Sequence, residues 1–409
     1  MKSLHTASAL TALALAASAS CLLADPVESS LDSTFGKLEE SVPGKFNIDA
    51  RLRYESFDLD NGVPANDRDG TSLRVRYGYT TPAFAGFTAM VEGETLTRVG
   101  GDAADIHPAD DAGDGTDLNQ LWVNYKNDDF GSVKLGRQIY TLDDHRFIGH
   151  VGWRQNIQVF DALTAAYTAV DKLTISGFYI DEVHSVNGAH NDLDALGLNA
   201  SLAFSKELKV TAFMYNIEGE DNVAQSADTV GVRATGSFAL EEVTFNYALS
   251  YAQQGDNDAS PAAFDADYMA GDLSAVIAGF TVGAGFEVLE PGFRTPLATL
   301  HKFNGFADVF LGASGTGIAN GLEDVYGYIG YAIPLGEKKS IPVKLIYHSF
   351  SPESGAGDYG DEIDIVASYK VNKYLSLVAK YGSYDSDGGS GGVGGVDKDM
   401  FTFEMNFKY

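Results

Sequence analysis

Apolar and polar residues alternate with a period of two along most of the chain that follows Pro43-Gly44. A period of two places successive side chains on opposite faces of a β-strand. The pattern therefore predicts an all-β chain whose strands each have one apolar and one polar face. The alternation is clearest in residues 46–55, 72–79, 243–251 and 401–409.

The links between the predicted strands differ in length, and long links alternate with short ones. An outer-membrane barrel shows this alternation, because its external loops are long and its periplasmic turns are short. We therefore predict that residues 44–409 form a transmembrane antiparallel up-and-down β-barrel of about eighteen strands, correct to within about two, with both termini in the periplasm. The long links are 58–70, 98–117, 140–156, 182–194, 218–226, 255–263, 289–322, 352–360 and 385–397; the short links include 80–86, 127–131, 170–172, 205–207, 239–242 and 371–373.

Residues 1–24 have the order of a secretory signal peptide. Lys2 precedes a short apolar stretch, and small residues follow that stretch. The stretch is too short to span a membrane as a helix. We expect cleavage after Ala24, with cleavage after Ala19 as the alternative. Cys21 is the only cysteine, so no disulfide can form within the chain; we expect it to leave with the signal, and lipidation is the alternative.

Residues 25–43 break the strand pattern. Apolar residues recur there at spacings typical of one face of a helix, and they are Leu31, Phe35, Leu38 and Val42. We expect a short periplasmic segment. It is either a helix that packs under the barrel or pairs with another copy, or a frayed tail.

The composition excludes several functional classes. The chain has 57 acidic and 28 basic residues and a formal net charge of −29, which argues against nucleic-acid binding. No apolar run reaches about 18 residues, so helical membrane spans are not expected. The histidines show no metal-ligand spacing, and no cofactor is expected. Acidic residues gather in loops, and those in residues 102–117 are expected to be solvated, with calcium binding as the alternative.

Charged residues occupy the inward parity of the first three predicted strands. Four arginines against two glutamates leave an excess of positive charge. This excess predicts an anion track along the pore wall, since charged groups lining a pore set its ion selectivity. The alternative is a ladder of ion pairs that only stiffens the wall. The residues are Arg51, Arg53, Arg74 and Arg76, here called the arginine ladder, with Glu92 and Glu94 as possible ion-pair partners.

Two long links are too rich in apolar and aromatic residues to be freely solvated. We expect both to fold into the barrel or to pack on its rim. The candidate polar residues at the first link are Arg137, Asp143, Asp144, Arg146 and Arg154. The candidates in the second link are His301, Lys302, Asn304 and Asp308.

These two links resemble segments of the alginate-export family of outer-membrane barrels. The resemblance rests on the elements GRQ, DDxRF, WRQ and FDA at the first link, and on TLHKFNGFADxFL before GLxD at the second. It implies an eighteen-stranded monomeric pore, lined by arginines and acids, that passes an anionic polysaccharide. It also implies that Arg137, Arg154 and residues 301–308 lie near the constriction. Arg137 departs from the pattern, because it shares the parity of Leu135 and should face lipid unless a bulge follows Gly136 or it lies above the membrane.

The predicted function is a passive channel in the bacterial outer membrane for anionic solutes, acidic saccharides among them, which diffuse through an arginine-lined lumen. A general or cation-preferring porin is the alternative within transport. A hydrolase or an adhesin on a barrel scaffold is the alternative of another class. His348 and Ser349 are adjacent in a strand and face opposite ways, and no carboxylate is evidently placed to orient the histidine, so a catalytic triad is not expected. The expected partners are outer-membrane lipid, anionic solutes and, through the aromatic carboxy-terminal strand, the barrel-assembly machinery.

Overall fold

The computed structural model of the chain describes residues 24–60, 68–100, 115–336, 339–390 and 392–409. The expected signal peptide, apart from Ala24, and the acidic residues 102–114 lie outside the described residues. No helix among the described residues is long and apolar enough to cross a membrane.

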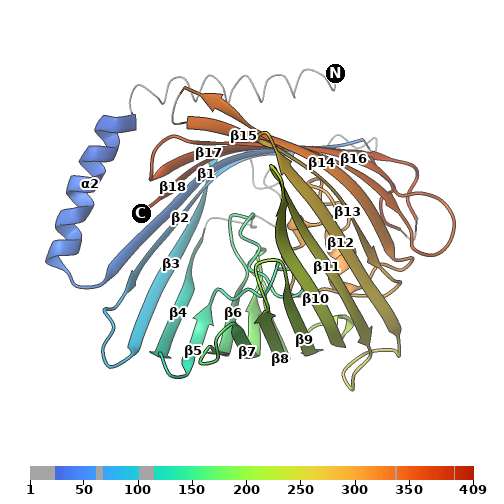
Figure 1. Cartoon of the computed structure of the whole chain (residues 1–409), viewed down its shortest axis with the longest axis horizontal. Coiled ribbons are helices and arrows are strands. Elements are labelled where there is room, and N and C mark those ends of the chain that lie inside the picture. The colour runs from blue at the N-terminus through green and yellow to red at the C-terminus, as the bar shows by residue number, and fades with distance from the viewer. Residues whose placement is uncertain (1–23, 61–67, 101–114, 337–338, 391) are drawn as a thin grey trace.

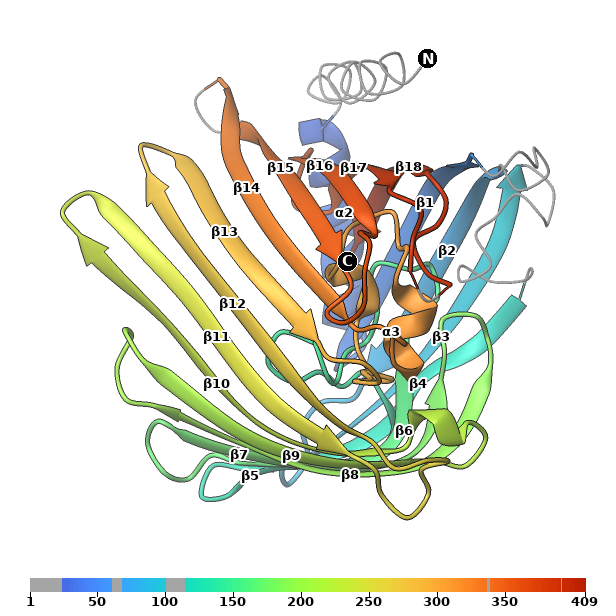
Figure 2. The ribbon, with the colours of Figure 1, turned by 90° about the vertical axis from the view of Figure 1, so that its right-hand side faces the viewer.

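Eighteen strands form one antiparallel sheet that closes on itself (Figures 1 and 2). Each strand pairs with the next one in the sequence, and β18 pairs with β1. The predicted up-and-down barrel and its strand number are confirmed. The strands are β1 (Lys45–Leu59), β2 (Arg68–Thr80), β3 (Phe87–Gly100), β4 (Gly115–Asn127), β5 (Gly131–Gln138), β6 (Val159–Tyr167), β7 (Leu173–His184), β8 (His190–Ala203), β9 (Lys209–Gly219), β10 (Ala227–Leu240), β11 (Val243–Gly255), β12 (Asp265–Ile277), β13 (Phe280–Leu289), β14 (Leu322–Leu335), β15 (Lys339–Ser351), β16 (Gly360–Lys370), β17 (Leu375–Ser386) and β18 (Lys398–Lys408).

The alternation in the sequence decides which side chains face outward. On β1, Tyr54 is 36% exposed, whereas its neighbour Arg53 is fully buried. Hydrocarbon cannot hydrogen-bond to a backbone, so the strands must satisfy one another and turn their apolar faces toward lipid. Large apolar side chains are accordingly exposed on strand after strand, among them Leu135, Leu196, Met214 and Val325.

The two ends of the sheet meet in a continuous register. Leu52 lies opposite Met405, and Asp49 lies opposite Lys408. At the end of this seam the backbones of Ile48 and Tyr409 exchange two hydrogen bonds, of 2.8 and 3.1 Å. The last residues of the chain therefore complete the closure between β18 and β1.

Helix α2 (Ala24–Ser41) precedes the barrel (Figure 1). Its Phe35 ring stacks on the ring of Tyr409, with centroids 3.6 Å apart, and contacts the ring of Tyr374. Its Asp32 pairs with Lys373 at 2.6 Å. The helix thus lies against the β16–β17 turn and the end of β18.

Two long loops enter the barrel (Figures 1 and 2). The first loop is residues 139–158; the second loop is residues 290–321 and carries the short helices η5 (Leu300–Lys302) and α3 (Leu311–Thr316). As predicted, their apolar side chains are buried inside, against inward side chains of the wall. The buried cluster includes Ile148, Phe293 and Phe310 from the loops and Phe178, Phe213 and Tyr268 from the strands.

Deletion of Phe407–Tyr409 is expected to prevent closure of the barrel. The deletion removes the backbone partners of Ile48 and Ala50, and each unsatisfied backbone group in lipid costs several kcal/mol. The measurement is the amount of heat-modifiable protein in the membrane on a detergent gel. Phe35→Ala is the matched control, because it removes the contact with the helix and leaves the seam intact. Normal levels of heat-modifiable truncated protein would contradict the prediction.

Candidate functional site

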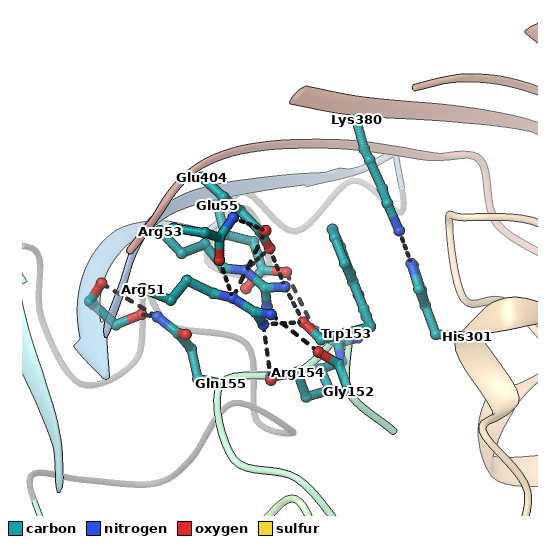
Figure 3. Close-up of polar contacts among 12 residues, drawn as sticks. Arg51, Arg53, Glu55, Gly152, Trp153, Arg154, Gln155, His301, Lys380 and Glu404 are labelled. Atoms are coloured by element: carbon teal, nitrogen blue, oxygen red, sulfur yellow. Dashed lines mark hydrogen bonds and ion pairs between the residues drawn. The ribbon is translucent and has the colours of Figure 1, made fainter. Parts of the chain in front are cut away.

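The first loop lies against inward side chains of β1 (Figure 3). Arg51 donates hydrogen bonds of 2.9–3.1 Å to three successive backbone carbonyls, those of Gly152, Trp153 and Arg154. Arg53 also donates to the carbonyl of Trp153. A guanidinium group has five donors and no acceptor, so it suits a run of carbonyls. The two arginines hold this stretch of backbone against the wall.

Arg76 extends the same contact by one residue. It donates to the carbonyl of Gln155 at 3.0 Å. The side-chain amide of Gln155 donates to the Ser72 hydroxyl at 2.7 Å. Arg76 also pairs with Glu94, as the sequence suggested. Residues 152–155 are therefore tied to both strands of the arginine ladder.

Carboxylates compensate the charge of the arginine ladder. Glu404 on β18 lies 2.7 Å from Arg53 and 3.7 Å from Arg51, and Asp49 pairs with Arg74. The expected excess of positive charge is therefore wrong, because β18 and β1 itself supply further acids. The guanidinium groups point inward but are covered, since no ladder side chain is more than 12% exposed.

Two candidates make contacts that the sequence did not predict. Glu92 pairs with no ladder arginine in the described residues and instead accepts hydrogen bonds from the amides of Asn47, Asn119 and Gln120. Arg137 lies on the outer face of β5, the face of the exposed Leu135, and pairs with Asp161 at 2.8 Å. Its assignment to the pore lining is wrong, because β5 pairs with β4 through Gly136 without a bulge.

The indole of Trp153 is enclosed by cations and a second ring (Figure 3). The His301 ring stacks on it with centroids 4.2 Å apart and planes 4° apart. The Arg53 guanidinium carbon lies 4.1 Å from the indole centroid, and the Lys380 ammonium lies 3.5 Å from it. A desolvated cation–π contact contributes about 2 kcal/mol. Trp153 therefore connects both loops to β1 and β17.

Arg154 connects the wall to both loops. Its buried guanidinium pairs with Glu55 of β1 at 3.2 Å and with Asp308 of the second loop at 2.6 Å. Asp308 also accepts a hydrogen bond from His301 Nδ1 at 2.7 Å. His301 Nε2 then accepts from Lys380 at 3.1 Å. This network assigns the His301 proton to Nδ1.

Burial sets the protonation of this histidine–aspartate pair. Burial lowers the pKa of His301 to about 3, and the nearby Asp308 opposes that shift only in part. Burial alone would raise the pKa of Asp308, but the contacts with His301 and Arg154 hold it below its usual range. Near neutral pH the imidazole is therefore neutral and the carboxylate is ionised.

Carboxylates of β16 hold the backbone of the second loop. The Ala307 amide donates to Glu362 at 2.7 Å, and the Phe306 amide donates to Asp364 at 3.1 Å. Gly305 has φ +86°, and a Cβ there would lie 2.3 Å from a carboxylate oxygen of Glu362. Glycine is therefore required for this approach.

Arg146 anchors the first loop to β13. Its buried guanidinium Nε lies 2.8 Å from Glu287. Glu287 also accepts a hydrogen bond from the Asn304 amide at 2.7 Å, and the same amide donates to Asp324 at 3.2 Å. These four side chains join the two loops to β13 and β14.

The remaining candidates contact β8 and β10. Asp143 accepts a hydrogen bond from Asn199 at 2.7 Å, and Asp144 pairs with Arg233 at 2.7 Å. Lys302, which is exposed, donates to the backbone carbonyl of Asp144 at 2.8 Å. The two loops therefore reach nearly the whole circumference of the wall.

Two hollows border the second loop. One, of about 360 Å³, is lined by charged groups and tyrosines, among them Arg233, Lys302, Lys344, Asp272, Tyr326 and Tyr328. The other, of about 450 Å³, includes Arg154, His301 and Leu300 in its lining. No ladder arginine lines either hollow in the part of the chain that the structure describes.

His348 has an orienting carboxylate that the sequence did not reveal. Its Nδ1 lies 2.8 Å from Asp324. Ser349 lies on the opposite face of β15, paired with the exposed Val325. The serine is therefore turned away from the histidine, as the strand alternation predicted, and no Ser-His-Asp triad forms from these residues.

Several polar residues of this network were not identified from the sequence, and they lie both on β1 and on strands after β3. The signal was present elsewhere: Glu404 alternates with Phe403 and Met405 in the same way. The missed residues are Asp49, Glu55, Glu287, Asp324, Glu362, Asp364, Lys380 and Glu404.

Comparisons with known proteins agree with the fold. The family model described as Alginate export matches residues 42–279, more than half of the chain, and this match includes the first loop. No curated protein matches the chain significantly. Similar solved structures include a BenF-like porin from Pseudomonas fluorescens Pf-5 (TM-score 0.72, 13% identity, 90% of this chain and 99% of that chain) and Pseudomonas aeruginosa OpdL (0.65, 12%, 90% and 98%). Pseudomonas aeruginosa OpdK with vanillate is also similar (0.69, 12%, 89% and 98%).

Arg51→Ala is expected to loosen the first loop and to raise single-channel conductance. Each hydrogen bond from a charged donor contributes about 1.5–3 kcal/mol, and the substitution removes the three that reach the loop backbone. Arg68→Ala, six positions before Arg74 on β2, is the matched control and should leave conductance unchanged. Equal conductance of wild type and Arg51→Ala would show that the arginine does not hold the loop.

Acid is expected to release the second loop from the first. A released His301 binds its proton near pH 6.5, whereas the docked residue has a pKa of about 3. Because the docked state binds fewer protons, docking is fully favoured above about pH 6.5 and weakens as pH falls toward 3. Burial also lowers the pKa of His150, to about 4, which acts in the same direction.

The measurement is conductance between pH 7 and pH 4, which should rise on acidification. His301→Gln keeps a donor for Asp308 but cannot gain a proton, so its response to pH should be smaller. A response of the same size in this variant would assign the effect to other groups.

Proposed function

We propose, because the chain belongs to the alginate export family, that it lets anionic solutes such as acidic saccharides diffuse across the outer membrane past its two inward loops. The chain is an outer-membrane porin, a channel and not an enzyme. The observation that carries the proposal is that both loops are fixed inside the lumen. The arginine ladder holds the first loop, and carboxylates of β13, β14 and β16 hold the loops at other places.

The hollows beside the second loop suit small polar solutes. Their volumes, about 360 and 450 Å³, fall within the range of about 300–1,000 Å³ typical of small-molecule sites. Tyrosine rings and hydroxyl groups line the first hollow, through Tyr268, Tyr326 and Tyr328. Such groups offer both an apolar face and a hydrogen-bonding end to a sugar ring.

Cationic side chains border both hollows and support the preference for anions. Lys302 and Lys344 line the first hollow. Arg233 in the first hollow and Arg154 in the second are each paired with carboxylates, so the two lysines carry most of this argument. The ladder arginines contribute indirectly, because they fix the segment that carries Arg154. The similar structure of OpdK with vanillate, which is a carboxylate, points to the same class of solute.

A cation-preferring porin is the second candidate. Carboxylates line the first hollow together with the lysines, namely Asp144, Asp272, Glu287, Asp324 and Asp364. Several of them are committed to partners: Asp144 to Arg233 and Glu287 to Arg146. Asp272 accepts hydrogen bonds from Tyr326 and Tyr328. The net charge that these acids and the lysines present to the first hollow decides between an anion-preferring and a cation-preferring porin.

The wild-type barrel is expected to prefer anions in a planar bilayer under a salt gradient, and to admit glucuronate into liposomes. The double variant Lys302→Gln, Lys344→Gln should reduce the ratio of anion to cation permeability severalfold, since a unit charge at about 4 Å is worth about 1 kcal/mol even in bulk water. Lys206→Gln is the matched control, because Lys206 is exposed in the β8–β9 turn. A cation-selective wild type would overturn the proposal in favour of the second candidate.

A further inference from the structure

Two histidines meet at the end of the β7–β8 hairpin. His184 is the last residue of β7, His190 is the first of β8, and the two are direct partners in the antiparallel register. Their ring centroids lie 4.2 Å apart. Glu182, two residues before His184, has the same parity and lies beside both rings.

This cluster belongs to the outer face of the barrel. Val183, between Glu182 and His184, is 3% exposed and packs in the interior, so its two neighbours point outward. The side chain of His190 is 58% exposed and that of Glu182 is 23% exposed. The side chain of His184 is 10% exposed, so a solute reaches the cluster from the side of His190 and Glu182. None of the three side chains lines either hollow, and the cluster is distinct from the proposed transport function.

The separations of the polar atoms match those between the ligands of one metal ion. His184 Nε2 lies 3.3 Å from one carboxylate oxygen of Glu182, and His190 Nδ1 lies 3.1 Å from the other. Tetrahedral zinc has bonds of about 2.0–2.2 Å, so neighbouring ligand atoms lie about 3.3–3.6 Å apart. One ligand atom from each of the three residues lies within 4.8 Å of the others. Small side-chain shifts suffice to bring all three onto one ion.

A further carboxylate supports the cluster from β6. Asp161 Oδ2 lies 3.2 Å from His184 Nε2. Arg137 fixes this carboxylate through two hydrogen bonds, of 2.9 and 2.8 Å. Asp161 therefore faces the same nitrogen as Glu182 does, where it can complete a four-ligand set. This gives the outward-facing pair of Arg137 and Asp161 a role that the pore does not provide.

We propose that Glu182, His184 and His190 bind a zinc ion at the end of the β7–β8 hairpin. Two imidazoles and a carboxylate suit zinc and related transition metals, whereas calcium and magnesium prefer oxygen ligands alone. The ion joins two adjacent strands and so holds the end of the hairpin in register.

The test is zinc titration calorimetry on the untagged full chain, folded in detergent and first stripped with a chelator. The wild type should bind one zinc ion per chain and should give no comparable response to calcium. His190→Ala should weaken binding by more than tenfold, because losing even an outer-shell partner of a metal site costs about 10–100-fold. Zinc should also raise the unfolding temperature of the wild type and not that of His190→Ala.

His145→Ala is the matched control, because it removes an imidazole from the first loop and leaves the hairpin intact. It should bind zinc as the wild type does. His190 is largely exposed, so its replacement should leave a heat-modifiable barrel. Wild-type protein that binds no zinc, or a His190→Ala variant that binds it as tightly as the wild type, would overturn the proposal.

Discussion

The backbone's need for hydrogen-bond partners in hydrocarbon governs the rest of this structure. A strand edge left open in lipid has no water to satisfy it, so the sheet must close, and β18 must meet β1 in one register. In the closed sheet, alternate side chains face the outside and the inside of the barrel. Tyr54 therefore lies outside and its neighbour Arg53 lies inside. The position of a charged residue in the alternation, and not its own polarity, decides whether its side chain faces outward or inward.

Backbone groups inside the barrel also need hydrogen-bond partners. Two long loops bring irregular backbone into the barrel, and their carbonyls and amides need partners there. Wall arginines supply donors to the carbonyls of residues 152–155, and Glu362 and Asp364 accept from amides of the second loop. Positively charged side chains therefore bind the backbone carbonyl groups of the first loop, and negatively charged side chains bind the backbone amide groups of the second loop. The arginine ladder is in large part the docking face of the first loop.

The fold was predictable from the sequence because parity and link length are local properties. The inward folding of both loops was also predictable, since side chains such as Ile148 and Phe310 cannot remain in water. The pairing of charges was predictable only in part: the sequence suggested Arg76 with Glu94 on the next strand, but other pairs depend on which strands become neighbours at closure. Glu404 contacts Arg53 although the two are 351 positions apart in the sequence. No local sequence pattern predicts a contact between residues so far apart. The histidine pair was missed for another reason: His184 and His190 have no metal-ligand spacing in sequence, and the exact register of their hairpin makes them neighbours.

Pairing also changes how the wall acts on a solute. An isolated buried guanidinium would exert a field far into the lumen, whereas a guanidinium beside a carboxylate presents a dipole whose field falls off faster with distance. Arg53 with Glu404, Arg74 with Asp49 and Arg76 with Glu94 are such pairs. We therefore expect their influence on transport to be mainly mechanical, through the position of the first loop. Under the proposed function, we expect direct electrostatic selection to come from groups that border the hollows, above all the exposed Lys302, whose one hydrogen bond among the described residues goes to a backbone carbonyl and not to an acid.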